Sequence, residues 1–277
     1  MAMGGFNRAS RRAIHSLQSL LPEKTGGVFI LAYHLVDGGT DFPVDLSGPV
    51  FRRHMEYIAT NARPCALAEA VNILERKQIS QVTNVVITFD DAYGNFYTHV
   101  WPVMREMRIP CTLYVPVDFI EGKSPAPLQG LRSLAPCSWG QLREIAESGL
   151  VGIGSHTFSH PNLQRVSAEY LLREIVNSRK ELESRLGMEV TSFAYPRALW
   201  SAKADRYVRE SYDNAVVAGG KKLYPGNWDR YRLSRMPVRR DMEDIAPLLH
   251  ASVWLEEKIA SLVRPWKHRI KEAGDSW

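Results

Sequence analysis

Residues 85–91 read Val-Val-Ile-Thr-Phe-Asp-Asp, a mainly apolar run that ends on two carboxylates. Such a run predicts a strand that is buried on both faces. Similar runs predict further strands at residues 28–33, 111–117, 151–155, 190–195 and 214–218. Apolar residues at helical spacing predict helices between them, at residues 51–62, 67–76, 96–107, 141–148, 168–186 and 202–211. This alternation indicates an α/β protein with a parallel sheet, either a barrel or a doubly wound sheet.

The composition is that of a globular protein. The 277 residues are 45% hydrophobic and 23% charged, which excludes disordered, collagen-like and disulfide-scaffold chains. Cys65, Cys111 and Cys137 are too widely spaced for a metal knuckle or a disulfide framework, so we interpret them as buried thiols in a reducing compartment. The net charge of +5 is too small to choose among nucleic acid, an anionic membrane and an acidic substrate. No nucleic-acid-binding motif accompanies it.

Polar side chains with metal-ligating chemistry follow two of the predicted strands. Asp90 and Asp91 leave the strand at 85–89 and must point in different directions, because successive side chains of a strand alternate. One carboxylate can bind a metal while the other faces water, although an isolated pair of aspartates more often caps a helix. His156 and His160 follow the strand at 151–155 and lie four residues apart, so they can share one metal.

Two histidines and one carboxylate form a metal site with open positions. These ligands suit Zn, Fe, Co, Ni or Mn, and the coordination geometry decides which of these metals binds. A divalent ion in such a site polarises a carbonyl group and lowers the pKa of bound water, which the second aspartate can then deprotonate.

Three segments resemble the motifs of the polysaccharide deacetylases, which are carbohydrate esterase family 4 with a NodB-homology domain. Residues 87–93 (Ile-Thr-Phe-Asp-Asp-Ala-Tyr) are similar to the first motif, 156–160 (His-Thr-Phe-Ser-His) to the second and 192–196 (Ser-Phe-Ala-Tyr-Pro) to the third. The resemblance covers about residues 28–240. It implies a distorted (β/α) barrel of about seven parallel strands. It also implies removal of the N-acetyl group from an N-acetylhexosamine, in a glycan of the bacterial cell envelope or in a lipid-linked sugar.

The resemblance also implies roles for particular residues. Asp91, His156 and His160 would hold one divalent ion, with Zn as the first choice, and Asp90 would be the base that deprotonates the metal-bound water. The acid that protonates the leaving amine is usually a histidine near the C-terminus, in a Leu-x-His motif.

Two histidines compete for the acid's role. His250, in Leu-Leu-His, matches the usual motif in sequence but lies in a predicted helical stretch. His34 ends the strand at 28–33, as in permuted members of the family such as the poly-N-acetylglucosamine deacetylases. Because chemistry lies at the carboxyl ends of parallel strands, we prefer His34.

The third motif departs from the family pattern. It lacks the arginine that usually pairs with the base, and Arg235 is our candidate for supplying that charge, against a solvated basic turn as the equal alternative. Arg197 replaces an aromatic residue, but its backbone N–H can still stabilise an oxyanion. The expected substrate and oxyanion residues are Tyr93, Trp139, Tyr195, Pro196 and Arg197, with Tyr93 and Trp139 offering flat faces to sugar rings.

The two ends of the chain are expected to be helices outside the catalytic domain. We divide the chain into a basic N-terminal helix at 1–25, a catalytic domain at 26–242 and an amphipathic helix at 243–277. No run reaches the ~18 apolar residues of a membrane span, and the N-terminus lacks the apolar segment of a secretory signal, so a cytoplasmic protein is expected. The end helices allow peripheral contact with anionic lipid at the inner face of the membrane, but packing on the domain is preferred.

The sequence is also compatible with other functions. The altered third motif also permits hydrolysis of another non-peptide amide, including a cyclic one. A carbohydrate-binding pseudoenzyme is disfavoured because the base, the three ligands and the acid are all present. A non-haem iron oxygenase would use the same ligand type, but the βα alternation argues against its usual antiparallel scaffold.

Overall fold

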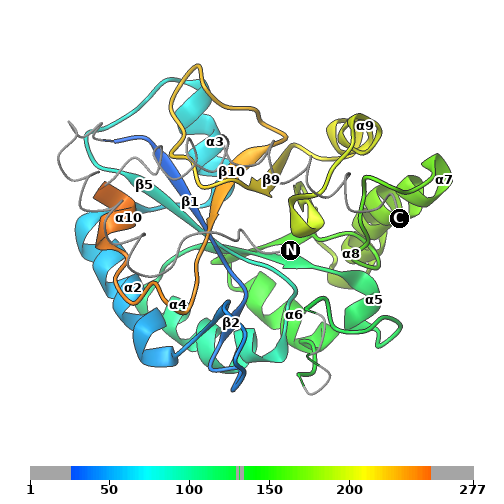
Figure 1. Ribbon diagram of the computed structural model, residues 1–277, viewed down its shortest axis with the longest axis horizontal. Helices are drawn as coiled ribbons and strands as arrows, with labels where there is room; N and C mark the ends of the chain where they lie inside the picture. The colour runs from blue at the N-terminus through cyan, green and yellow to red at the C-terminus, as the bar shows by residue number, and fades with distance from the viewer. Residues whose placement is uncertain (1–25, 129–130, 132–133, 251–277) are drawn as a thin grey trace, which may run out of the picture.

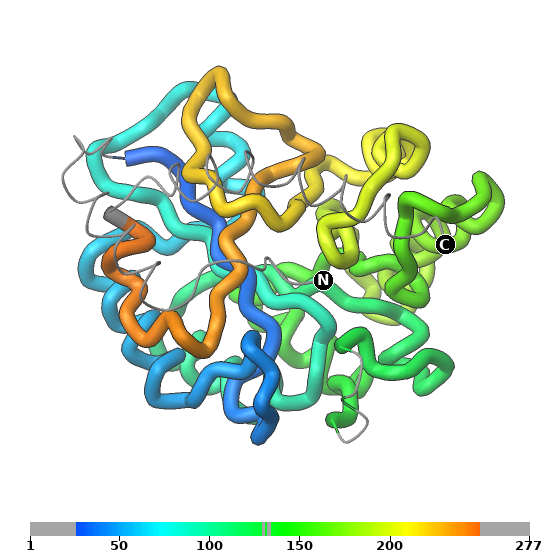
Figure 2. Tube along the Cα trace, viewed as in Figure 1, coloured from blue at the N-terminus to red at the C-terminus, as the bar shows by residue number. Residues whose placement is uncertain are grey.

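The computed structural model describes residues 26–128, 131 and 134–250, and within them the strands form a closed parallel barrel. The barrel strands are β1 (Val28–Tyr33), β5 (Asn84–Phe89), β6 (Cys111–Val115), β7 (Val151–Ser155), β8 (Ser192–Ala194), β9 (Asn214–Ala218) and β10 (Leu233–Pro237). The ring closes because β1 pairs on one side with β10 and on the other with β5. Figure 2 shows this meeting of the two ends of the ring, with the blue and orange segments side by side.

Shorter strands lie beside this ring. β4 (Arg63–Pro64) pairs with the start of β5, while β2 (Leu35–Val36) and β3 (Asp45–Leu46) form a separate parallel pair. Of the described strands, the seven named above therefore make the closed ring. The barrel that the family resemblance implies is confirmed, and the doubly wound alternative is excluded.

Helices surround the strands (Figure 1). The larger ones are α2 (Gly48–Asn61), α3 (Leu67–Glu75), α4 (Trp101–Met107), α6 (Trp139–Glu147), α8 (Ser178–Leu186) and α9 (Ala202–Ser211). Short elements are η1 (Phe96–Val100), α5 (Val117–Ile120), α7 (Ala168–Leu171), η2 (Leu172–Asn177), η3 (Pro196–Ala198) and α10 (Ala246–His250).

Two predicted single helices contain a π-helical turn. The one predicted at 96–107 begins as η1, where the N–H of Trp101 donates to the carbonyl of Phe96, five residues back. Pro102, at the start of α4, has no N–H and cannot continue regular α-helical bonding at this point. The one predicted at 168–186 contains the π-turn η2 between α7 and α8. π-turns of this kind occur frequently near functional sites.

The apolar core has two layers because strand side chains alternate between the barrel interior and the surrounding helices. In β1, Phe29 and Leu31 belong to the outer layer, whereas Val28 and Ile30 belong to an inner cluster. That inner cluster also contains side chains of α3. Toward the carboxyl ends of the strands the inward positions become polar, and a functional site can form there.

The predictions for the cysteines, for one strand end and for the two ends of the chain have different outcomes. All three cysteines are buried and free, as expected. The strand predicted at 111–117 ends at Val115, because residues 117–120 form α5. Residues 1–25 and most of 243–277 lie outside the described residues, so the helices expected there and their membrane contact stay predictions. Among the described helices, none is long and apolar enough to cross a membrane.

Substitution of Gly154 by alanine should destabilise the barrel. A Cβ atom there would lie 2.4 Å from Cε1 of Tyr114 and 3.1 Å from the carbonyl oxygen of Ser192. Overpacking of this kind costs about 1–3 kcal/mol in the free energy of unfolding, measurable by urea denaturation. Gly152→Ala in the same strand is the control, because its nearest neighbour would lie at 3.8 Å. Equal effects of the two substitutions would contradict the packing described here.

Candidate metal centre

Three metal-ligating side chains converge at the carboxyl end of the barrel. Asp91 follows β5, His156 follows β7, and His160 lies in the loop beyond. The Nε2 atoms of both histidines lie 3.7 Å from Oδ1 of Asp91. One possible ligand atom from each of the three residues lies within 4.8 Å of the other two. Among the described residues, these three form the cluster of side chains that could hold a metal ion.

The donor atoms fit a divalent cation. Oδ1 of Asp91 is buried and has no hydrogen-bond partner among the described residues, which is costly for a carboxylate unless a cation compensates. Nδ1 of His156 lies 2.9 Å from the carbonyl oxygen of Ala194, so it carries the proton and leaves the Nε2 lone pair free for a metal. The three side chains can therefore hold a metal ion.

The protonation states agree with this fit. Burial lowers the pKa of His156 to about 4, and burial together with the charges of His156 and Arg197 lowers the pKa of His160. Both imidazoles are thus neutral near pH 7, the form that binds metals. Burial, and then the charge of Asp90, raises the pKa of Asp91 well above its usual range in the metal-free protein. A bound cation would oppose this effect and favour the carboxylate.

The backbone around the ligands is strained. Asp91, Ala92, Thr157 and His160 have φ angles of 74°, 51°, 71° and 57°, in the left-handed region that favours glycine. Each such residue costs of order 1–3 kcal/mol, and strain of this kind gathers at functional sites. The turn after β5 aims Asp90 and Asp91 differently, as the sequence predicts.

Asp90 forms a buried ion pair with Arg235. Nη1 and Nη2 of Arg235 donate to the two carboxylate oxygens at 2.7 and 2.8 Å, and Nη1 also donates to Thr88 at 3.0 Å. Arg235 lies in β10 rather than in a solvated turn, and is 2% exposed. Burial raises the pKa of Asp90, but the charges of Arg235, His156 and His34 outweigh it and hold that pKa below its usual range. Asp90 is therefore an ionised carboxylate.

His34 lies beside Asp90, with its Nε2 atom 3.8 Å from Oδ2 of the carboxylate. Burial lowers the pKa of His34, the charge of Asp90 opposes this, and Arg235 adds to the lowering. The rival residue His250 ends α10. The carbonyl of the preceding Leu249 accepts a hydrogen bond from Lys222, which also bonds to Thr83 before β5. The backbone at the end of α10 thus lies at the amino end of the barrel.

The third-motif residues divide into buried and exposed ones. Tyr195 is 1% exposed and its hydroxyl donates to Asp205, and Pro196 is buried, so neither side chain reaches a substrate directly. Arg197 is exposed, with φ of 55°, and its N–H has no hydrogen-bond partner among the described residues. That N–H is available to an oxyanion.

The two aromatic residues expected to stack on sugar rings lie elsewhere. Tyr93 is fully buried, packs on Phe119 and accepts a hydrogen bond from the N–H of Leu128, so the stacking prediction is wrong in this conformation. The ring of Trp139 is half-buried and faces the guanidinium of Arg185 at 5.5 Å, on the helical layer. The stacking prediction for Trp139 stays a prediction.

Sequence reasoning assigns no role to Glu174, which lies fully buried beneath the loop that carries His160. A signal for it exists in the sequence. Glu174 lies three residues after Leu171 and eight residues before Leu182, a helical spacing, and both leucines are buried. A charged residue on an apolar helix face needs partners, because a lone buried charge is costly.

Known proteins resemble this chain in sequence. The sequence profile described as polysaccharide deacetylase matches residues 77–215, which include Asp90, both histidines and the third motif but neither His34 nor Arg235. YxkH of Bacillus subtilis is 27% identical over 232 residues, 81% of this chain and 76% of YxkH. The poly-beta-1,6-N-acetyl-D-glucosamine N-deacetylase of Staphylococcus epidermidis is 24% identical over 203 residues, 69% of this chain and 67% of that protein.

A solved structure shares the fold. IcaB from Ammonifex degensii superimposes with a TM-score of 0.70 at 24% identity, covering 81% of this chain and 97% of that one.

The affinity for Zn²⁺ should rise with pH until Asp91 has lost its proton. Because the pKa of Asp91 is raised in the metal-free protein, the cation must displace a proton there, whereas the histidines are already neutral. Below that pKa the affinity should fall by about tenfold per pH unit. Calorimetry in buffers of different ionisation enthalpy counts the released proton. The Asp91→Asn variant should bind weakly and release none. A pH-independent affinity without proton release would count against this ligand set.

Proposed function

The chain belongs to the polysaccharide deacetylase family, and from this we propose that it is a metal-dependent N-deacetylase of an N-acetylated hexosamine. The observation that carries the proposal is the convergence of an ionised carboxylate, a histidine and a three-residue metal site at one end of the barrel. Amide hydrolysis needs a base for water, an acid for the leaving amine and a stabilised oxyanion, and this end of the barrel offers each.

A divalent cation held by Asp91, His156 and His160 would polarise the amide carbonyl and lower the pKa of water. Zn is the first choice, with Fe, Co, Ni and Mn as alternatives for this ligand type. The chain's own contribution is to hold these donors deprotonated and correctly oriented.

Asp90 acts as the base. Its carboxylate stays ionised because Arg235 binds both oxygens, and Arg235 thereby also fixes the orientation of the carboxylate. Asp90 takes one proton from the attacking water as the new C–O bond forms at the acetyl carbon. The carbonyl oxygen becomes negatively charged, and the free N–H of Arg197 donates to it.

His34 acts as the acid. Its Nε2 lies 3.8 Å from Oδ2 of Asp90, so the proton taken from water can pass to the imidazole after a small movement. A lowered pKa makes the protonated ring a ready donor. His34 gives the proton to the sugar nitrogen as the C–N bond breaks, which leaves a free amine and acetic acid, and the acid then releases its proton to solvent as acetate.

The relatives support a proposal for the substrate class. The Staphylococcus epidermidis relative acts, by its name, on poly-beta-1,6-N-acetyl-D-glucosamine, and the match extends over 67% of that protein. We propose a β-1,6-linked N-acetylglucosamine glycan as the first substrate to examine. A lipid-linked amino sugar at a membrane surface is the second.

The decisive experiment measures acetate release from a panel of N-acetylated substrates. The panel contains β-1,6-linked N-acetylglucosamine oligomers, chitooligosaccharides, peptidoglycan fragments and polyprenyl-linked amino sugars. The Asp90→Asn variant should keep its metal and one of its two hydrogen bonds to Arg235, because only the amide oxygen can accept from the guanidinium. It should lose on the order of 10²–10⁴ in turnover, because the amide cannot take the proton from water.

The outcomes separate the proposed roles. Loss of metal from Asp90→Asn would mean that the two aspartates exchange roles. No acetate from any substrate, with metal firmly bound, would overturn the deacetylase assignment and favour another amide or a binding role.

The acid is tested by replacing histidines one at a time. His34→Ala should lower turnover on the order of 10² or more, with the metal retained. His99→Ala is the control, because that side chain is 44% exposed and pairs only loosely with Asp37. If His250→Ala is impaired and His34→Ala is not, the assignment of the acid to His34 is wrong.

A further inference from the structure

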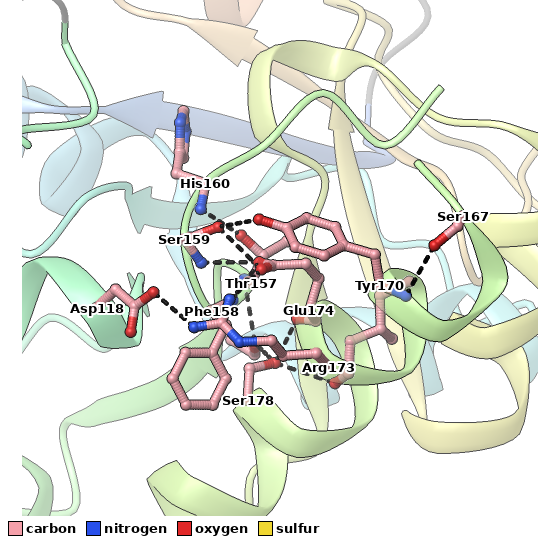
Figure 3. A network of polar contacts seen from close by, with 12 residues as sticks. Asp118, Thr157, Phe158, Ser159, His160, Ser167, Tyr170, Arg173, Glu174 and Ser178 are labelled. Carbon is pink, nitrogen blue, oxygen red and sulfur yellow. Dashed lines mark hydrogen bonds and ion pairs between the residues drawn. The ribbon is translucent and has the colours of Figure 1, made fainter. Parts of the chain in front are cut away.

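The loop that carries His160 is held by side chains from a neighbouring helix, and its central glutamate has no part in the mechanism above. We infer that Glu174 is a positioning residue, whose carboxylate fixes the loop at 157–160 so that His160 faces Asp91 and His156. Figure 3 shows Glu174 beneath the loop and the ring of His160 on the opposite side. The inference rests on the proposed metal site and concerns how the chain builds it.

The carboxylate of Glu174 accepts hydrogen bonds from successive residues of the loop. Its Oε2 atom accepts the N–H of Phe158 at 2.9 Å and the N–H of Ser159 at 2.7 Å. Its Oε1 atom accepts the hydroxyl of Ser159 at 2.8 Å. Successive N–H groups that converge in this way form an anion-binding concavity. Here the anion is a side chain of the protein itself.

The remaining N–H groups of the loop also bond to side chains. Thr157 donates to Oγ of Ser155 at 3.2 Å, and His160 donates to Oγ1 of Thr157 at 2.9 Å. Ser155 is in turn supported by Ser178, whose Oγ lies 2.9 Å away. Glu174 and Ser178 are four residues apart and therefore share one helix face. The π-turn η2 and the start of α8 thus support the loop at two points.

Other contacts of Glu174 fix its position. Nη1 of Arg173 donates to Oε1 at 2.6 Å, while Nη2 of the same guanidinium donates to Asp118 at 2.8 Å. The backbone N–H of Asp118 donates to the carbonyl of Phe158 at 2.7 Å. Glu174 is fully buried, so water cannot replace these bonds. Every group that contacts the two carboxylate oxygens of Glu174 is a hydrogen-bond donor. Only a carboxylate side chain can accept all of these hydrogen bonds.

This arrangement explains how the loop keeps its strained shape. Thr157 and His160 both have positive φ angles, at 71° and 57°. Such residues persist only where surrounding contacts determine the conformation. Without the carboxylate, the N–H groups of Phe158 and Ser159 would lose the acceptor that they share, and the loop would relax. His160 would then move away from Asp91, although no atom of Glu174 is a metal ligand.

The test compares Glu174→Gln with Glu183→Gln. Glu183 lies on α8 and also accepts an arginine and a backbone N–H, from Arg179 and Val190, but it has no described contact with the loop. In Glu174→Gln an amide NH₂ group faces hydrogen-bond donors. We expect Zn²⁺ affinity, measured against a chelator, to fall about 10–100-fold in Glu174→Gln. The visible spectrum of the Co²⁺ form should change as well. Glu183→Gln should match the wild type in both.

Milder variants cover the case in which Glu174→Gln does not fold. Glu174→Asp keeps the charge on a shorter side chain. Ser178→Ala leaves the carboxylate of Glu174 in place but removes the hydroxyl that supports Ser155 and bonds to the backbone carbonyls of Glu174 and Ile175. Both should lower Zn²⁺ affinity less than Glu174→Gln and should speed amide hydrogen exchange at residues 157–160 in the metal-free protein.

Each outcome bears on a distinct claim. A lower melting temperature with unchanged Zn²⁺ affinity and Co²⁺ spectrum in the folded Glu174 variants would make Glu174 merely structural and overturn the inference. A wild type that binds no divalent cation would overturn both the inference and the proposed function. A wild type that binds Zn²⁺ but releases no acetate would count against the function alone.

Discussion

The pairing of β1 between β10 and β5 is the constraint on which the site depends. It closes the sheet into a barrel and brings His34, Asp90 and Arg235 to one point, although Arg235 lies 145 residues from Asp90 along the chain. In an open sheet the first and last strands would form separate edges. Closure also encloses the carboxyl ends of the strands, so charges there are largely removed from water.

Buried charge is the main energetic problem of such a site. Asp90 and Arg235 compensate one another with two hydrogen bonds, which is the geometry in which a buried pair is tolerated. Asp91 has no comparable partner among the described residues, and its free oxygen faces two neutral imidazoles. The adjacent aspartates thus have opposite pKa shifts. Environments that shift the pKa values of two neighbouring titratable groups in opposite directions are typical of sites for acid–base and metal chemistry.

The supporting residues come from a different layer than the reacting ones. Strand ends and the loops after them supply His34, Asp90 and the metal-binding residues, whereas the helical turn η2 supplies Glu174. Hydrogen bonds from such supporting residues fix the orientation in which the metal-binding side chains meet an ion.

The sequence by itself indicated six of the seven barrel strands, the candidate metal-ligating residues and the resemblance to the family, because apolar runs and short motifs are local. The pattern of strands and helices could not distinguish a barrel from an open sheet, because both folds have the same alternation of the two elements. Only the resemblance to the family favoured the barrel. It could not decide whether Arg235 lies in a turn or beside Asp90, and it misplaced Tyr93, whose ring is buried against Phe119. It also assigned no role to Glu174. These features depend on contacts between residues far apart in the chain, and only the closed tertiary structure determines which side chains meet and which are buried.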